Sequence, residues 1–258
     1  MSMRTSHRGF TLIELMVAVL IGLFLIGGLL TLVQAMRRTS TMQGGLSQLQ
    51  DNERMTTTLM TDVIQSSGYF PNPLVNSATT EFPVTGSFTV AGQALVGTGA
   101  YGAAVPGDTI TVRYATAGGD GVINCSGGTS AVAATFTNTF SVDAFGNLNC
   151  VLTVNNGTIT TTTIQLISGQ IVNGALVSGV TDLQIYYGVQ TNIAAANSSV
   201  DTYLDANGVI AGNYWGNVIS VKLTLTYVNP LSGQAGQTTT TIPFTRVVAV
   251  MQKTGVTT

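Results

Sequence analysis

The most constraining feature of this chain is a long apolar segment near its amino terminus. No ionisable side chain occurs from Leu15 to Val33, and residues 10–13 extend the segment with only Glu14 between them. About 24 residues at ~1.5 Å each form a helix of ~36 Å, which is long enough to cross the hydrocarbon core of a bilayer. The sequence therefore predicts that residues 10–34 form the membrane-spanning half of an N-terminal helix.

Basic residues precede this segment, at Arg4 and Arg8, as they do in secretory signal peptides. The apolar core of a signal peptide is usually only about 7–15 residues long. Residues 34–38, with the sequence QAMRR, also offer no small-residue cleavage site. Both facts oppose a signal peptide and leave a plain membrane anchor as the simplest alternative.

Glu14 is the one acidic residue in the apolar segment. A carboxylate inside a membrane helix costs ~2–3 kcal/mol on insertion scales and less near the interface. The positive end of the helix dipole offsets part of this cost in the first turn. No cation of the chain lies at the same depth, so we expect the partner of Glu14 to be a group on another subunit or a newly formed amine.

Charged residues are rare throughout the chain, and their scarcity excludes several classes of protein. They make up 8% of the 258 residues, against roughly 25% in typical soluble domains. The 9 basic and 11 acidic residues give a formal net charge of −2, so we expect no nucleic-acid partner. The only histidine is His7 and the only cysteines are Cys125 and Cys150. These counts exclude a four-ligand zinc site of Cys and His, and a Ser-His-Asp set would have to use His7. We therefore predict no catalytic residue, no metal site and no cofactor.

Residues 35–67 are predicted to form the amphipathic half of the same helix. Apolar residues recur there at three- and four-residue spacing, at Leu46, Leu49, Leu59, Met60, Val63 and Ile64. Gly44 and Gly45 interrupt this pattern, and two glycines in a helix interior cost about 2 kcal/mol relative to alanine. We expect a bend or local melting at these glycines and the end of the helix at residues 66–68.

Beyond Gly68 the hydrophobic period changes from 3.6 to 2, which is typical of half-buried strands. The stretches with this pattern are 110–114, 158–167, 183–189, 219–227 and 244–251, and turn signals lie at 155–157, 206–208, 229–230 and 232–233. Pro243 indicates a strand start or an edge strand. The apolar strand faces need cover, which the helix can supply. The sequence therefore predicts an α+β fold in which residues 68–258 form an antiparallel β-rich head, with residues 68–106 and 190–215 unassigned.

Three polar or aromatic features of the head are candidates for a binding or catalytic site. Residues 205–208 (DANG) resemble part of a calcium loop, but Tyr203 and Tyr214 stand where carboxylates are required, so an Asx turn is expected. Lys222 lies at a polar position of a strand and is expected to be solvated. Trp215 is expected to pack at a strand edge.

The motif around the start of the apolar segment resembles the processing signal of type IV prepilins. It reads Arg8-Gly9-Phe10-Thr11-Leu12-Ile13-Glu14-Leu15-Met16-Val17. The resemblance implies that residues 1–9 are a leader removed after Gly9 by prepilin peptidase, and that Phe10 becomes the N-methylated first residue. It also implies that Glu14 pairs with the terminal amine of a neighbouring subunit, which supplies the missing partner. Type IV pilins and secretion pseudopilins share this motif.

Later stretches resemble the PilW-type minor pilins. They are residues 49–54 (LQDNER) followed by Asp62 and Gly68-Tyr69, residues 180–189 (VTDLQIYYGV) and residues 215–221 (WGNVISV), in the order of that family. The family often has an acidic loop after Tyr-Gly-Val, whereas residues 190–194 here are uncharged. The resemblance implies a type IV pilin-like fold, with one long helix packed against an antiparallel head.

This resemblance also implies where the protein is found. It predicts a single pass through the bacterial inner membrane with the C-terminal head in the periplasm, and later a place in the pilus fibre at the cell surface. In an oxidising compartment, two cysteines and no others predict a disulfide between Cys125 and Cys150. Closing a loop of about 26 residues contributes roughly 3 kcal/mol in the chain-entropy model.

The function implied is that of a minor pilin that helps to prime type IV pilus assembly in a tip-proximal complex. Its partners would be other minor pilins and the major pilin, contacted through the N-terminal helix, together with prepilin peptidase and the inner membrane. Cell adhesion and twitching motility would depend on it indirectly. The alternatives are a J-type minor pseudopilin of a type II secretion system and a membrane-anchored, adhesin-like head. An enzyme is disfavoured.

Overall fold

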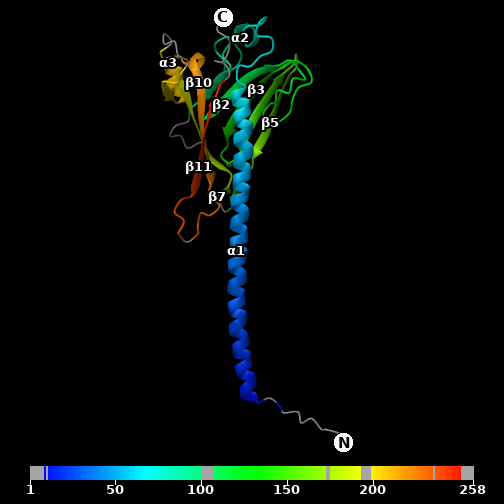
Figure 1. Ribbon diagram of the computed structural model, residues 1–258, viewed down its shortest axis with the longest axis vertical. Helices are drawn as coiled ribbons and strands as arrows, with labels where there is room; N and C mark the ends of the chain where they lie inside the picture. The colour runs from blue at the N-terminus through cyan, green and yellow to red at the C-terminus, as the bar shows by residue number, and fades with distance from the viewer. Residues whose placement is uncertain are drawn as a thin grey trace. The chain divides into compact units, whose positions relative to one another are not determined.

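The computed structural model describes residues 9, 11–99, 107–172, 175–192, 199–234 and 236–250 (Figure 1). The chain divides into two compact units, Met1–Ser47 and Gln48–Thr258. Helix α1 (Leu12–Gln65) begins in the first unit and ends in the second.

The ends of α1 follow from local hydrogen bonding. At the start, the Thr11 hydroxyl accepts a hydrogen bond from the Glu14 N–H at 3.4 Å, as an N-cap side chain does. At the end, Gly68 adopts a left-handed φ of 80° and its N–H donates to the Arg113 carbonyl at 3.0 Å. The predicted end of the helix at residues 66–68 is therefore confirmed.

The chain remains helical through Gly44 and Gly45. The prediction of local melting there is wrong, and the bend stays a prediction. The physical reason is the cooperativity of helix formation. Each residue added to an existing helix gains a backbone hydrogen bond, so the long helical segments on both sides keep Gly44 and Gly45 helical despite their low helix propensity.

The first sheet of the head is a five-stranded antiparallel meander. Its strands are β1 (Leu95–Thr98), β2 (Thr109–Thr116), β3 (Ala134–Val142), β4 (Leu148–Asn155) and β5 (Ile159–Ile167), in that spatial order. Buried and half-buried residues alternate along all of β3, so one face of the sheet packs inward and the other carries polar side chains. A tight turn at residues 156–158 joins β4 to β5, as predicted.

The second sheet has four antiparallel strands in the order β11-β10-β8-β9. They are β8 (Val180–Val189), β9 (Thr202–Leu204), β10 (Val218–Val228) and β11 (Thr241–Ala249). A separate hairpin pairs β6 (Gln170–Val172) with β7 (Ala175–Ser178). Three short helical segments complete the described part of the head: α2 (Ala78–Glu81), α3 (Ala206–Gly212) and the 3-10 segment η1 (Trp215–Asn217).

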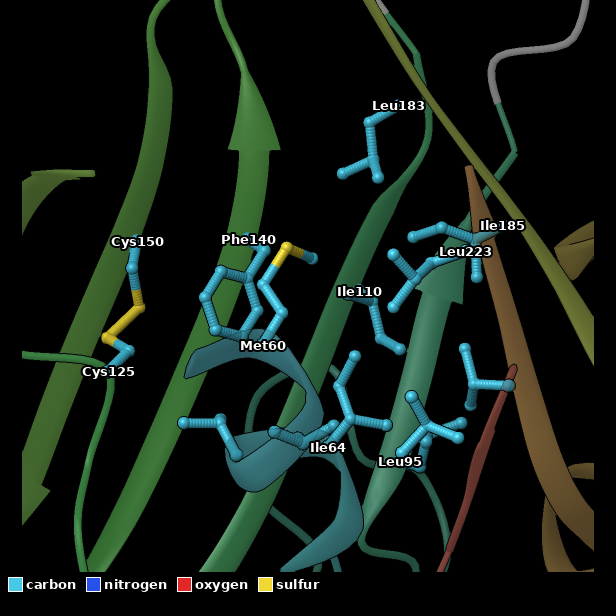
Figure 2. Packing of buried hydrophobic residues seen from close by; sticks show 14 of the residues in the cluster. Met60, Ile64, Leu95, Ile110, Cys125, Phe140, Cys150, Leu183, Ile185 and Leu223 are labelled. Atoms are coloured by element: carbon cyan, nitrogen blue, oxygen red, sulfur yellow. A yellow bond between two sulfur atoms is a disulfide. The ribbon is translucent and has the colours of Figure 1, made fainter. Parts of the chain in front are cut away.

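One hydrophobic core joins the two main sheets to the last turns of α1. Figure 2 shows Met60 and Ile64 of α1 beside Phe140 of β3 and Ile110 of β2, with Leu183 and Leu223 of the second sheet nearby. Met60 and Ile64 are fully buried. The predicted α+β architecture, a long helix covering antiparallel sheets, is confirmed.

The predicted strand stretches correspond to strands of the structure, whereas one predicted turn is wrong. The stretches at 110–114, 158–167, 183–189, 219–227 and 244–251 correspond to β2, β5, β8, β10 and β11, although Met251 lies outside the described residues. Pro243 lies within β11, which is an edge strand as predicted but does not start there. The turn predicted at 206–208 is wrong: Asp205 caps helix α3 by accepting a hydrogen bond from the Gly208 N–H at 2.8 Å.

Candidate functional site

The predicted processing site lies directly before α1. Gly9 is exposed, and a Cβ added to it would meet no atom within 4 Å. Phe10 and residues 1–8 lie outside the described residues. The space around Gly9 is therefore open in the described part of the structure.

Glu14 lies in the first turn of α1, on an exposed part of the helix. Its N–H is held by the Thr11 carbonyl at 3.1 Å in addition to the Thr11 hydroxyl. No ion pair of Glu14 with another described residue is present in the structure. The carboxylate is thus placed at the positive end of the helix dipole, on an exposed residue.

The first part of α1, around and after Glu14, exposes apolar side chains on every side. Exposed fractions reach 79% at Leu12, 84% at Phe24 and 60% at Leu29. Of the described helices, α1 alone is long and apolar enough to cross a membrane, with a mean hydropathy of 2.7 over its most apolar window. A helix that is apolar on every side is stable only when lipid or neighbouring apolar helices surround it.

The last part of α1 has a different role. Leu49, Met60, Val63 and Ile64 are buried in the core of the head, and Thr56 is buried among them. Part of the predicted apolar stripe therefore packs against the sheets, whereas Leu59 is only partly buried.

The structure joins Cys125 and Cys150 in a disulfide, as Figure 2 shows. Cys125 lies in the long connection between β2 and β3, Cys150 lies in β4, and their Cα atoms are 6.5 Å apart. Both residues are fully buried, and the Cys125 N–H donates to Asn138 Oδ1 at 2.9 Å. The bridge therefore fastens the β2–β3 connection to the core.

A buried cation, Arg113 of β2, was not singled out from the sequence. Its guanidinium donates to the carbonyl oxygens of Gln93 and Pro83 at 2.7 Å and of Phe82 at 3.1 Å. It also lies over the Phe88 ring, 4.1 Å from the centroid. Burial lowers the pKa of Arg113 to about 10, so the side chain remains protonated at neutral pH. Arg113 thus fastens the segment 82–93 over the outer face of the first sheet.

Trp215 and Lys222, the aromatic and basic side chains considered as candidate sites, both pack against tyrosine rings of β8. Trp215 lies in η1 and packs edge-to-face on Tyr187, with ring centroids 4.9 Å apart. Lys222 is partly exposed, and its amine lies 5.8 Å from the centroid of Tyr186. Among the described residues, no three His, Cys, Asp or Glu side chains gather as metal ligands would.

Comparison with known proteins gives two matches to family models. Residues 4–30 match the prokaryotic N-terminal methylation motif, and residues 150–254 match the model of the type IV pilus-assembly protein W, or PilW. The second match runs from β4 to the end of β11 and includes the whole second sheet. No curated protein and no solved structure matches the chain. The chain is therefore similar to the type IV pilus-assembly protein W over residues 150–254, and it carries the prokaryotic N-terminal methylation motif at the start of its long apolar helix.

Proposed function

We propose that this protein is a minor pilin that primes type IV pilus assembly as part of a tip-proximal complex of minor pilins. In this proposal prepilin peptidase cleaves after Gly9, Phe10 is N-methylated, and the mature helix packs among the helices of other pilins. The protein is a substrate of the peptidase and a structural subunit, and it catalyses no reaction itself.

The observation that carries the proposal is the single carboxylate of Glu14 on an exposed apolar helix. After cleavage, the positively charged amine of Phe10 in one subunit is the ion that a carboxylate four residues further along a neighbouring helix can pair with. A low dielectric strengthens such a pair, because the attraction between two charges at a given distance rises as the dielectric constant falls. Glu14 would therefore set the register between adjacent helices.

Replacing Glu14 tests this role. Glu14→Ala should leave leader removal intact but abolish or strongly reduce surface pili, because the amine of the neighbouring subunit loses its counter-ion. Thr31→Ala is a matched control, since Thr31 lies in the same apolar segment and its hydroxyl bonds only to the Gly28 carbonyl of its own helix. Immunoblots of membrane and sheared-pilus fractions measure both steps. Unchanged piliation in Glu14→Ala would remove the proposed pairing.

The N-terminal motif is also compatible with a J-type pseudopilin of a type II secretion system, because both classes use it. Deleting the gene and scoring surface pili and secreted proteins side by side separates the two. The proposal requires loss of pili with normal secretion. Loss of secretion with normal pili would favour the pseudopilin, and a glycan-binding signal from the full-length protein would favour an adhesin-like head.

A further inference from the structure

The described edge strands of the two main sheets differ in how well they are protected. Two of them are short: β1 has 4 residues and β9 has 3. The edge strand β11 has 9 residues but carries Pro243 and Arg246. Proline, charge and shortness are the usual devices that stop an edge from pairing with another strand.

Strand β5 has none of these devices. It is 9 residues long, with the sequence ITTTTIQLI, and contains no charge, no proline and no glycine. Among the described strands it pairs with β4 alone, from Ile159 opposite Asn155 to Ile167 opposite Leu148, with one register shift between Asn149 and Leu148. Its other edge therefore presents a row of backbone N–H and C=O groups to solvent, and the ligand that matches such a row is an extended strand.

A groove lies beside the second half of β5. It has a volume of about 540 Å³ and lies between α1, the disulfide-linked residue Cys125 and the strand. Its apolar lining comes from Met55 and Leu59 of α1 and from Ile164 and Leu166 of β5. Three charged residues of α1 also line it: Asp51, Arg54 and Asp62. Met55 is 63% exposed, which is unusual for an apolar side chain next to a core. Side chains of an added strand could enter this groove and cover these residues.

We propose that the free edge of β5 and the adjoining groove receive a β-strand from the head of a different pilin subunit, with apolar side chains at alternate positions. The inference rests on the proposed function, because an assembling complex of minor pilins supplies such a head. Backbone hydrogen bonds along β5 would provide affinity, and the groove would select apolar side chains on one face of the incoming strand.

A second copy of this chain fits the site less well. In an antiparallel pair of two β5 strands centred on Thr163, Ile164 would face Thr162 of the other copy, and Leu166 would face Thr160. The groove would then receive only threonines and stay largely unfilled. An incoming strand with larger apolar residues at these positions buries more apolar surface, at roughly 25 cal/mol per Å².

Site-specific photo-cross-linking in piliated cells tests the partner. Thr162 is exposed and lies opposite Leu152, whose side chain is buried, so both point to the core side of the sheet. A benzophenone amino acid at Thr162 of the full-length protein should give an adduct whose mass-spectrometric fragments identify an extended segment of another pilin subunit. The same residue at Thr245, an exposed position of β11, should give no such adduct. A homodimer adduct, or no adduct at Thr162, would overturn the proposal.

A charge on the edge supplies a second test. Thr162→Lys should reduce or abolish surface pili, because an inward-pointing charge at an edge opposes strand addition. Thr245→Lys adds the same charge to β11 and should leave piliation unchanged. If Thr162→Lys does not accumulate, the cross-linking result decides. If Glu14→Ala loses pili while Thr162→Lys retains them, the proposed function stands and the β5 site is wrong.

Discussion

At the scale of single residues, a glycine and a tyrosine illustrate how tightly the core of the head is packed. A Cβ added to Gly97 of β1 would lie 2.8 Å from the Thr109 carbonyl oxygen and would collide with the hydroxyl of Tyr187. Tyr187 is fully buried, and its hydroxyl has no hydrogen-bond partner among the described residues. Position 97 therefore has to lack a side chain, because Tyr187 of the second sheet occupies the space beside it.

This contact predicts a non-additive pair of substitutions. Gly97→Ala should lower the free energy of unfolding by about 2–3 kcal/mol, as overpacking typically does. Tyr187→Phe should be nearly neutral, because the hydroxyl that it removes makes no hydrogen bond to compensate for its burial. The double variant should be more stable than the sum of the single effects by about 1 kcal/mol, because the closest clash is gone. Urea unfolding of the four proteins measures this coupling, and strict additivity would contradict the contact.

Asp143, which follows β3, makes the stability of its turn dependent on pH. Burial opposes ionisation, but hydrogen bonds from Asn147, Asn149 and the Phe145 N–H outweigh it and lower the pKa of Asp143. The donors lie 2.8–3.0 Å from the carboxylate oxygens. A carboxyl group with a pKa lower in the folded state than in the unfolded state stabilises the fold above its unfolded pKa of about 3.9.

Stability should therefore fall as the pH drops below about 4 and through the lowered pKa of Asp143. Asp143→Asn should show a smaller fall over the same range, because its side chain does not titrate. It should also be less stable at pH 7 by about 1–2 kcal/mol, since an amide nitrogen cannot accept the hydrogen bonds. Thermal unfolding from pH 7 to pH 2.5 measures both effects. Identical pH profiles for the two proteins would exclude Asp143 as a source of the loss.

At the scale of elements, the disulfide determines how the β2–β3 connection is held. Cys125→Ala/Cys150→Ala should lower the free energy of unfolding by roughly 3 kcal/mol, because the unfolded chain regains the entropy of a loop of about 26 residues. The expected change can be checked by urea unfolding, with reduced wild-type protein as the comparison. Non-reducing mass analysis of periplasmic protein should also recover Cys125 linked to Cys150. Free thiols there would contradict the bridge.

The elements that were predictable from the sequence are those with a local signal. Helix α1 has no ionisable residue from Leu15 to Val33 and has an apolar stripe at its end, and the sequence of β10 alternates from Ile219 to Tyr227. Strands β1, β6, β7 and β9 have only 3 or 4 residues, too few to define a period. Strands β1 and β9 pair with the longer strands β2 and β8, whereas β6 and β7 pair with each other. Strand β3 does alternate, with Phe136 between two threonines and Phe140 between Thr139 and Ser141, so its sequence also carries a strand signal.

The candidate site also has parts that the sequence could predict and parts that it could not. The processing motif and Glu14 are contiguous in the sequence and could be recognised there. Arg113 occupies an outward position of β2, which sequence alternation marks as exposed, yet it is 3% exposed because residues 82–93 fold over it. The groove beside β5 is formed by α1, the β2–β3 connection and β5. Contacts between distant segments of this kind have no local pattern, so the sequence could not predict them.

At the scale of the whole molecule, the scarcity of charge has two origins. The first is the apolar half of α1, which anchors the protein once in the inner membrane with the head in the periplasm. The second is a head whose strands carry threonine, serine and asparagine in place of charged residues on their outer faces.

The leader, residues 1–9, contains Arg4 and Arg8. A substitution at Gly9 can test leader removal without affecting the folding of the rest of the protein. Gly9→Val should leave the full-length precursor in the membrane and keep the protein out of pili, because a branched side chain then occupies the position where the peptidase cleaves. A Cβ at Gly9 meets no atom within 4 Å, so the substitution should not disturb the fold itself. Gly44→Ala, at another glycine with open surroundings, is the matched control and should be processed normally. Mass spectrometry of the membrane-bound protein distinguishes the precursor from a mature chain that begins at methylated Phe10, and normal processing of Gly9→Val would refute the assigned cleavage site.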